Sequence, residues 1–237
     1  MGKEDTKQNP EESTEPKINM QRVEALMSAI TRQKITVDRF RFNMSEGDAL
    51  DLLAAHYGSI VKCRYGTPIF DENTERNLRY LAKYLTLEKP KFGVMFSGTC
   101  GNGKTTLMYA LQSAINDLDR RGHFKFLSEY FTVGMRIVDA MDIVIMAKDL
   151  NSIRSLRERS MLAIDDLGKE PTEVLDYGNV LSPVVDLMEY RYQHQLFTAV
   201  TTNLTPDEIR DKYGKRIADR FNEMLEVIVF DDISYRS

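Results

Sequence analysis

The chain is poor in the residues that build disulfide frameworks and metal centres. Its 237 residues include two cysteines and three histidines. Cys63 and Cys100 are too few for a disulfide framework or a four-cysteine zinc site. The histidines are scattered along the chain, which favours neither a metal-binding nor a catalytic role for them. We therefore expect a cytoplasmic protein whose core forms without covalent or metal cross-links.

Long hydrophobic runs and an excess of positive charge are also missing. No apolar run approaches the roughly 20 residues that a membrane-spanning helix needs, and we expect no secretory leader and no membrane partner. The net charge of −4 argues against a protein that coats nucleic acid by bulk electrostatics, but not against a local basic patch. Apolar residues make up 42% of the chain, as in ordinary globular proteins, which excludes wholesale disorder.

The front of the chain differs in composition from the rest. Residues 3–17 carry acidic residues, lysines and prolines but no apolar side chain, which predicts a disordered tail over residues 1–17. Apolar residues at helical spacing predict three helices, over Ile18–Ile30, from a Ser45 cap through Ile60, and from an Asp71 cap to Leu85. We interpret residues 18–69 as a helical N-terminal region that either binds a partner or packs on the remainder of the chain.

After Pro90, short apolar strands alternate with helices, a pattern typical of an α/β fold with a parallel sheet covered on both faces. The expected strands are Phe92–Phe96, Phe124–Leu127, Met161–Ile164, Phe197–Val200 and Glu226–Phe230. The expected helices are Lys104–Leu118, Val133–Lys148, Val180–Tyr192, Pro206–Tyr213 and Arg216–Met224.

One segment matches the phosphate-binding loop G-x-x-x-x-G-K-[ST] at every fixed position and lies between an expected strand and an expected helix. Its residues, with the one after them, are Gly98, Thr99, Cys100, Gly101, Asn102, Gly103, Lys104, Thr105 and Thr106. Glycines let successive backbone N–H groups face phosphates, and the helix N-terminus adds partial positive charge. The motif predicts that Lys104 reaches the β- and γ-phosphates of ATP, while the hydroxyl of Thr105 binds Mg²⁺. We interpret Cys100 as a tolerated spacer in the loop.

Two adjacent carboxylates come directly after the apolar strand Met161–Ile164. In a phosphate-loop protein, the first acid at such a strand end typically holds magnesium, and the second can orient and deprotonate the attacking water. Asp165 therefore takes the magnesium role and Asp166 the role of the base. The alternative is a strand that ends in a helix-capping pair. A glutamate is more usual than Asp166 at this place, which leaves the rate of hydrolysis open.

Further polar candidates come later in the chain. Asn203 comes after a strand at the edge of the sheet where ligands bind, and its amide could position the attacking water; a turn residue is the alternative. Arg216 and Arg220 lie four residues apart on one face of a helix, a spacing that by itself favours surface salt bridges.

The order of these motifs resembles that of the DnaC/DnaI bacterial helicase loaders, and the related IstB transposition ATPases share much of the pattern. The matching segments are Gly98–Thr105, Asp165–Gly168, Thr202–Leu204, Arg216–Phe221 and Ser234–Ser237. The resemblance extends from about Phe70 to the end and implies an AAA+ P-loop ATPase domain over residues 70–237. It also implies a parallel sheet of order 5-1-4-3-2. The first 70 residues lie outside it.

The resemblance assigns three roles. Asn203 becomes sensor 1, Arg220 an arginine finger offered to a neighbouring subunit's ATP, and Arg236 the sensor 2 arginine that reads the γ-phosphate. It implies hydrolysis of ATP with Mg²⁺, a homo-oligomer that forms on ATP binding, and action on a replicative helicase and single-stranded DNA. The alternative is an IstB-like accessory ATPase that acts on duplex DNA with a transposase. A small-molecule kinase is disfavoured, because we see no substrate lid or acceptor site after the loop.

Overall fold

The computed structural model describes residues 19–33, 39–122, 134–176 and 179–230. The chain divides into two compact units, Met1–Asp38 and Arg39–Ser237. The first unit contains α1 (Met20–Gln33), whose exposed side chains include Met20, Leu26 and Met27. The disordered tail predicted for residues 1–17 lies outside the described residues.

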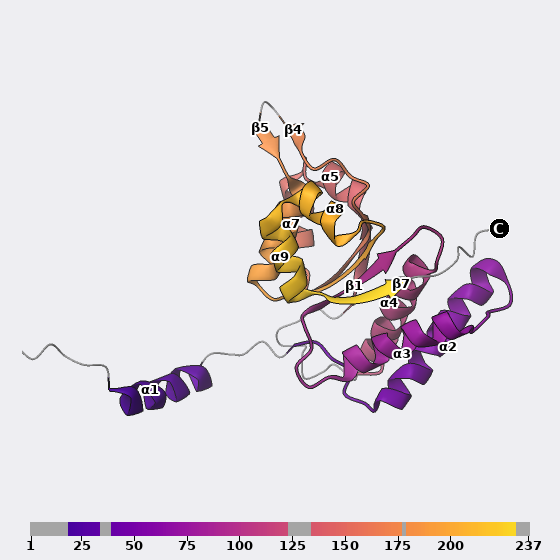
Figure 1. The fold of residues 1–237 in the computed structure, drawn as a ribbon, viewed down its shortest axis with the longest axis horizontal. Coiled ribbons are helices and arrows are strands. Elements are labelled where there is room, and N and C mark those ends of the chain that lie inside the picture. Colours follow the sequence, from indigo (N-terminus) through magenta and orange to yellow (C-terminus); the bar gives the residue numbers. More distant parts are fainter. Residues whose placement is uncertain (1–18, 34–38, 123–133, 177–178, 231–237) are drawn as a thin grey trace, which may run out of the picture. The chain divides into compact units, whose positions relative to one another are not determined.

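A five-stranded parallel sheet lies at the centre of the second unit (Figure 1). Its strands are β1 (Gly93–Gly98), β2 (Arg136–Asp139), β3 (Met161–Leu167), β6 (Phe197–Thr202) and β7 (Glu226–Phe230). Their spatial order is β2-β3-β6-β1-β7, which is 5-1-4-3-2 when the five strands are counted along the chain and the sheet is read from the β7 edge. The predicted sheet order is therefore confirmed. The three inner strands are almost wholly buried, which explains their continuous apolar runs.

Helices cover both faces of this sheet (Figure 1). One face packs against α3 (Glu72–Thr86) and α4 (Lys104–Arg120), and α2 (Glu46–Tyr65) packs on these two helices. The other face packs against α5 (Ala140–Met146), α6 (Leu150–Arg157), α7 (Pro183–Gln193), α8 (Pro206–Tyr213) and α9 (Lys215–Met224). Among the helices in the described ranges, none is both long and apolar enough to cross a membrane.

The packing of α2 bears on how the chain is divided. This helix packs against both α3 and α4, so it belongs to the same compact unit as the sheet. The region predicted over residues 18–69 thus spans both units, and its partner-binding role stays a prediction. The caps expected for the helices are present: the side chains of Ser45, Asp71 and Thr205 each accept a backbone hydrogen bond from the first turn.

The prediction was wrong between the phosphate loop and β3. A helix was expected over Val133–Lys148, but Arg136–Asp139 forms the edge strand β2. Two β-branched residues, Ile137 and Val138, favour the strand, and Asp139 then caps α5 with its side chain. The strand expected at Phe124–Leu127 lies outside the described residues. Helix α6 was not predicted at all.

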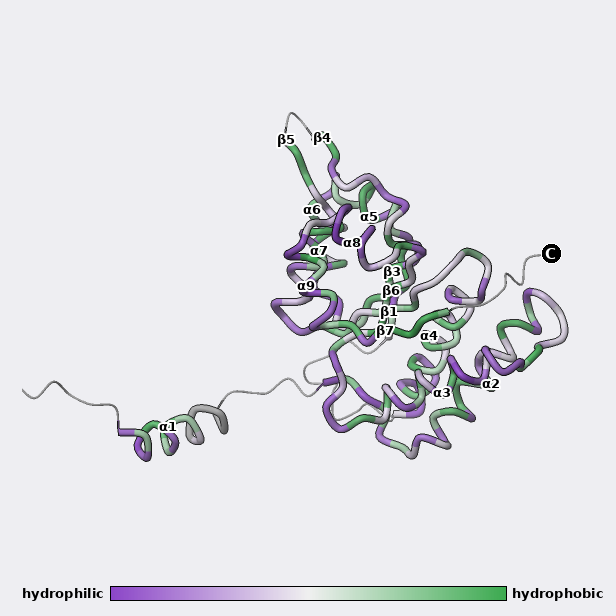
Figure 2. Tube along the Cα trace, viewed as in Figure 1, coloured by the Kyte–Doolittle hydropathy of each residue, from purple (hydrophilic) through white to green (hydrophobic). Residues whose placement is uncertain are grey.

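The segment before α7 also differs from the prediction. The helix expected over Val180–Tyr192 begins only at Pro183, which suits the first turn of a helix. Val180 instead lies in a two-stranded antiparallel hairpin of β4 (Val174–Asp176) and β5 (Asn179–Leu181). Figure 2 shows hydrophobic residues on this hairpin, where Leu175 pairs with Val180 and both side chains are exposed.

A buried arginine ties α7 to the start of two strands. Arg191 is fully buried, and its guanidinium donates hydrogen bonds to the hydroxyl of Thr198 (2.8 Å) and to the carbonyl oxygens of Arg159 (2.7 Å) and Phe197 (2.6 Å). Burial lowers the pKa of the Arg191 guanidinium to about 9. These bonds fix α7 against the segments that lead into β3 and β6.

Candidate functional site

The phosphate loop joins β1 to α4 with glycines in left-handed conformations. Gly98 has a φ of 144°, and a Cβ at this position would lie 2.2 Å from the carbonyl oxygen of Phe230. Gly103 has a φ of 90° and directly precedes α4. Any other residue would be strained at Gly103 and would also collide with β7 at Gly98. The loop therefore passes close to β7 before it turns into the helix.

Lys104 is folded back into this loop. Its side chain is only 5% exposed, and its ammonium donates hydrogen bonds to the carbonyl oxygen of Gly98 (2.7 Å) and to the amide oxygen of Asn102 (3.1 Å). Asn102 is itself buried and donates to the carbonyl oxygen of Phe230 (2.9 Å). Asn102 thus links the loop, the lysine and β7, a role that its place in the motif did not predict.

The carboxylates of β3 meet the loop from the other side. The hydroxyl of Thr105, on the first turn of α4, donates a hydrogen bond to Asp165 Oδ1 (3.0 Å). Asp166 has a φ of 58°, a left-handed conformation that aspartate adopts more readily than most residues. Its carboxylate forms an ion pair with Lys169. The bond to Asp166 raises the pKa of the Lys169 ammonium.

One cavity of about 580 Å³ brings most of the predicted residues together. Those that line it are Cys100, Gly101, Asn102, Gly103, Lys104, Thr105, Thr106, Asp165, Asp166 and Asn203. Strand geometry explains the meeting, because parallel strands place their carboxyl ends at one edge of a sheet. The exposed side chain of Asn203 comes directly after β6, next to the strand that carries the two carboxylates.

Sequence reasoning missed several lining residues. The far wall of this cavity is formed by the C-terminal half of α2 and the segment after it, and includes Tyr57, Val61, Tyr65 and Ile69. The four-residue spacing of Tyr57, Val61 and Tyr65 places them on one helical face, and this signal was available in the sequence. Lys169 also lines the cavity, but nothing in its sequence context singled it out.

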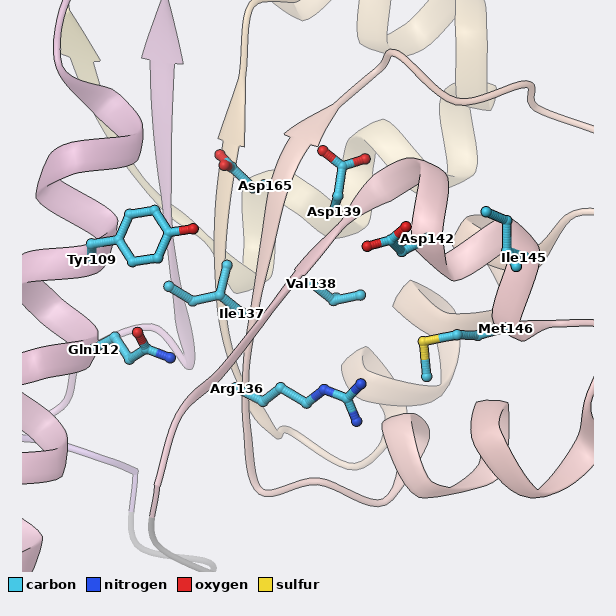
Figure 3. Close-up of a pocket in the computed structure, with 10 residues that line it drawn as sticks. All are labelled: Tyr109, Gln112, Arg136, Ile137, Val138, Asp139, Asp142, Ile145, Met146 and Asp165. Carbon is cyan, nitrogen blue, oxygen red and sulfur yellow. The ribbon is translucent and has the colours of Figure 1, made fainter.

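A second cavity of about 630 Å³ lies beyond Asp165, toward the edge of the sheet. Figure 3 shows Tyr109 and Gln112 of α4 on one side of it, opposite residues of β2 and α5. Asp139 ends β2 and is paired with Asp165 of the neighbouring strand β3. Asp165 therefore borders both cavities.

The arginine pair does not lie among the residues that line these cavities. Arg216 and Arg220 both bind the carboxylate of Glu189 on α7, Arg216 through Nε (2.8 Å) and Arg220 through Nη1 (2.6 Å). Arg216 first, and then Arg220, lower the pKa of Glu189. The guanidinium of Arg220 also lies over the ring of Tyr192, at 5.1 Å from its centre. Arg236 lies outside the described residues.

Comparisons with known proteins agree with this fold. No protein-family model matches the sequence, and no curated protein matches it. Among solved structures, the DnaC helicase loader is 21% identical with a TM-score of 0.53, covering 70% of this chain and 95% of its own. DnaI is also 21% identical, with a TM-score of 0.50, covering 72% of this chain and 88% of its own. The chain therefore shares the fold of the DnaC helicase loader over the matched part of its length.

Proposed function

We propose that the chain binds and hydrolyses ATP with Mg²⁺. The observation that carries this proposal is the single cavity in which a phosphate loop, two carboxylates and a polar amide face one another. Backbone N–H groups of the loop, the N-terminus of α4 and Lys104 together suit the β- and γ-phosphates. Lys104 would exchange its bonds to loop oxygens for bonds to phosphate.

The donor set suits a magnesium ion. Thr105 and Asp165 offer a hydroxyl and a carboxylate oxygen 3.0 Å apart, the hard oxygen ligands that Mg²⁺ takes. Among the described residues, no group of three histidine, cysteine or acidic side chains could hold a metal ion. A magnesium ion at Thr105 and Asp165 would therefore complete its shell with phosphate oxygens and water, and it would neutralise charge on the phosphates.

Hydrolysis needs a group that accepts a proton from water and one that holds the water in line. Asp166 has the chemistry of the first, and the amide of Asn203 has that of the second. The two side chains line the same cavity as Lys104. We propose Asp166 as the base and Asn203 as the sensor that positions the water.

The wall contributed by α2 suits the nucleoside. It presents the apolar and aromatic side chains Tyr57, Val61, Tyr65 and Ile69 to the same cavity as the loop. The tyrosine rings favour the stacking of a purine ring, and Val61 and Ile69 add apolar surface beside it. The triphosphate would then lie along the loop and the base against α2.

A neighbouring subunit would complete the site. Arg220 lies outside its own nucleotide cavity, which is compatible with a role as an arginine finger for an adjacent ATP. Arg236 remains a proposal for the residue that senses the γ-phosphate. In this proposal ATP binding assembles a homo-oligomer, and Glu189 releases Arg220 when the subunits meet.

We further propose that this ATPase works in DNA replication in the cytoplasm, as a loader that acts on a replicative helicase and single-stranded DNA. Fold similarity to the DnaC helicase loader supports this reading, and residues 18–69 are our proposal for the segment that binds the helicase.

The experiment that tests the proposal measures phosphate release by the purified chain with ATP and Mg²⁺, alone and with single-stranded or duplex DNA. We expect Mg²⁺-dependent turnover that single-stranded DNA alters more than duplex DNA does. A response to duplex DNA only would instead favour a transposition accessory ATPase. Failure to bind ATP would overturn the enzyme assignment.

A further inference from the structure

The pairing of β3 with β6 is irregular at the two carboxylates. Ile164 lies opposite Val200, and the next paired residues are Leu167 and Thr202. Two residues of β3, Asp165 and Asp166, therefore lie opposite one residue of β6, Thr201. This is a β-bulge, a device that redirects side chains and is frequent next to active sites.

The side chain of Thr201 forms hydrogen bonds with both bulged residues. The residue is fully buried, and its hydroxyl accepts a hydrogen bond from the backbone N–H of Asp166 (2.8 Å). The same hydroxyl donates its proton to Asp165 Oδ1, the oxygen that also accepts from Thr105. The bond to Asp165 uses the one proton of the hydroxyl, and the N–H of Asp166 occupies one of its lone pairs, so the two bonds together fix the direction of the hydroxyl.

One of the two bonds orients the side chain of Asp165, and the other stabilises the backbone of Asp166. The bond to Asp165 Oδ1 orients the carboxylate that faces Thr105. The bond from the N–H of Asp166 stabilises the left-handed backbone that aims the second carboxylate into the cavity. Valine has nearly the same shape as threonine but can make neither bond.

We propose that Thr201 is a positioning residue whose single hydroxyl sets the orientation of both the magnesium ligand Asp165 and the base Asp166. The proposal rests on the proposed ATPase function. A residue that only fills space at the bulge would be replaced by valine without effect on magnesium or turnover, and this difference makes the proposal testable.

The test compares Thr201→Val with Thr201→Ser, which keeps the hydroxyl, and with Thr198→Val. Thr198 is an equally buried threonine at the other end of β6, and its hydroxyl also makes two hydrogen bonds. For each variant we would measure kcat, the Mg²⁺ concentration for half-maximal activity, the affinity for a fluorescent ATP analogue without Mg²⁺, and the melting temperature.

We expect Thr201→Val to lower kcat about tenfold or more and to raise the Mg²⁺ requirement about tenfold, the usual effect of losing a group that orients a metal ligand. Its Mg²⁺-free affinity for the analogue should stay within about twofold of the wild type, because the phosphate loop is unchanged. Thr201→Ser should recover most of both losses. Thr198→Val should lower the melting temperature without changing the Mg²⁺ requirement.

Three results would overturn the proposal. A Thr201→Val variant with wild-type kcat and Mg²⁺ requirement would show that the hydroxyl is dispensable. Equal defects in Thr201→Ser, which keeps the hydroxyl, and Thr201→Val would assign the effect to packing at this position and not to the hydroxyl. A wild-type chain that fails to bind the ATP analogue would overturn the ATPase function and this proposal together, and so is distinguishable from the first two.

Discussion

Lys169 is ion-paired with Asp166, the carboxylate that we propose as the base. The ammonium is more than half exposed, yet it borders the same cavity as the phosphate loop. A carboxylate oxygen that accepts a hydrogen bond from an ammonium is not free to accept a proton from water. The ammonium of Lys169 therefore competes with water for the carboxylate of Asp166.

Replacement of Lys169 by methionine removes this charge and keeps most of the apolar length. We expect kcat at saturating ATP to rise about threefold, because the carboxylate of Asp166 would no longer have to leave an ion pair before it binds the attacking water. Steady-state phosphate release measures this, with Lys89→Met, an exposed lysine outside the cavity, as the control. A lower kcat together with weaker ATP binding would instead mean that Lys169 contacts the nucleotide.

Lys104→Met should reduce the affinity for ATP by about a hundredfold or more, because the proposed site loses its charged hydrogen bonds to the β- and γ-phosphates. Circular dichroism should show the helical content unchanged. Titration with a fluorescent ATP analogue measures the affinity, with Lys89→Met again as the control. An affinity equal to that of the wild type would contradict the phosphate-loop assignment.

Asp166→Asn should slow the hydrolysis of ATP without weakening the binding of ATP. Asparagine also tolerates the left-handed φ at this position, so the bulge should persist and ATP binding should stay near the wild-type value. Turnover should fall about a hundredfold or more, the usual contribution of a positioned base. If single-turnover rates match the wild type, Asp166 is only a structural residue and another group activates the water.

Arg220→Ala should bind ATP normally but hydrolyse it about a thousandfold more slowly, as expected for the loss of an arginine finger. Arg216→Ala is a matched control, because both arginines bind Glu189 from the same face of α9. Mixing Arg220→Ala with Lys104→Ala should restore part of the activity, since each variant damages a different half of a shared site.

The dependence of ATPase activity on protein concentration is a second test of the arginine-finger role. Wild-type activity per molecule should rise with protein concentration wherever assembly is incomplete. Normal hydrolysis by Arg220→Ala at high dilution, or equal defects in Arg216→Ala, would leave the pair as a salt bridge that stabilises α7 and α9.

His56 predicts a pH dependence of stability. It hydrogen-bonds Ser113 of α4 (2.9 Å), and burial lowers its pKa below the ordinary value of 6.5, with help from Arg121 and Arg120 and against the attraction of Asp117. The unfolded chain then binds the proton more readily than the folded chain. Stability is therefore full above pH 6.5 and decreases as the pH falls below it.

His56→Asn should remove this contribution. The free energy of unfolding, measured by urea denaturation on both sides of pH 6.5, should fall less steeply with acid in the variant than in the wild type. An identical pH dependence in the two proteins would show that other groups control acid sensitivity.

The features that were predicted correctly are those that a short stretch of sequence determines. The loop from Gly98 to Thr105 is a local motif, and its place between a strand and a helix is visible in the apolar pattern. The meeting of Asp165 and Asn203 in one cavity is explained by the rule that parallel strands end at one edge. These predictions needed no knowledge of side-chain packing.

The features that were missed depend on contacts between distant segments. The bulge at Asp166 forms because two residues of β3 lie opposite a single residue of β6. This pairing register cannot be read from the sequence of either strand alone. The far wall from α2 forms because that helix packs on α4, about fifty residues later in the chain. Strand β2 was mistaken for the start of a helix because its four residues are too few for a periodic signal.

The hydrogen bonds of Arg191 have a consequence for how this chain can vary. Most of its acceptors are backbone carbonyl oxygens, those of Arg157, Arg159, Ser160 and Phe197. Because every residue type has a carbonyl, exchanges of the side chains before β3 and β6 would leave these bonds intact. Insertion or deletion of a residue there would displace the carbonyls from a buried cation. The turns that lead into the two strands are therefore constrained in length rather than in sequence.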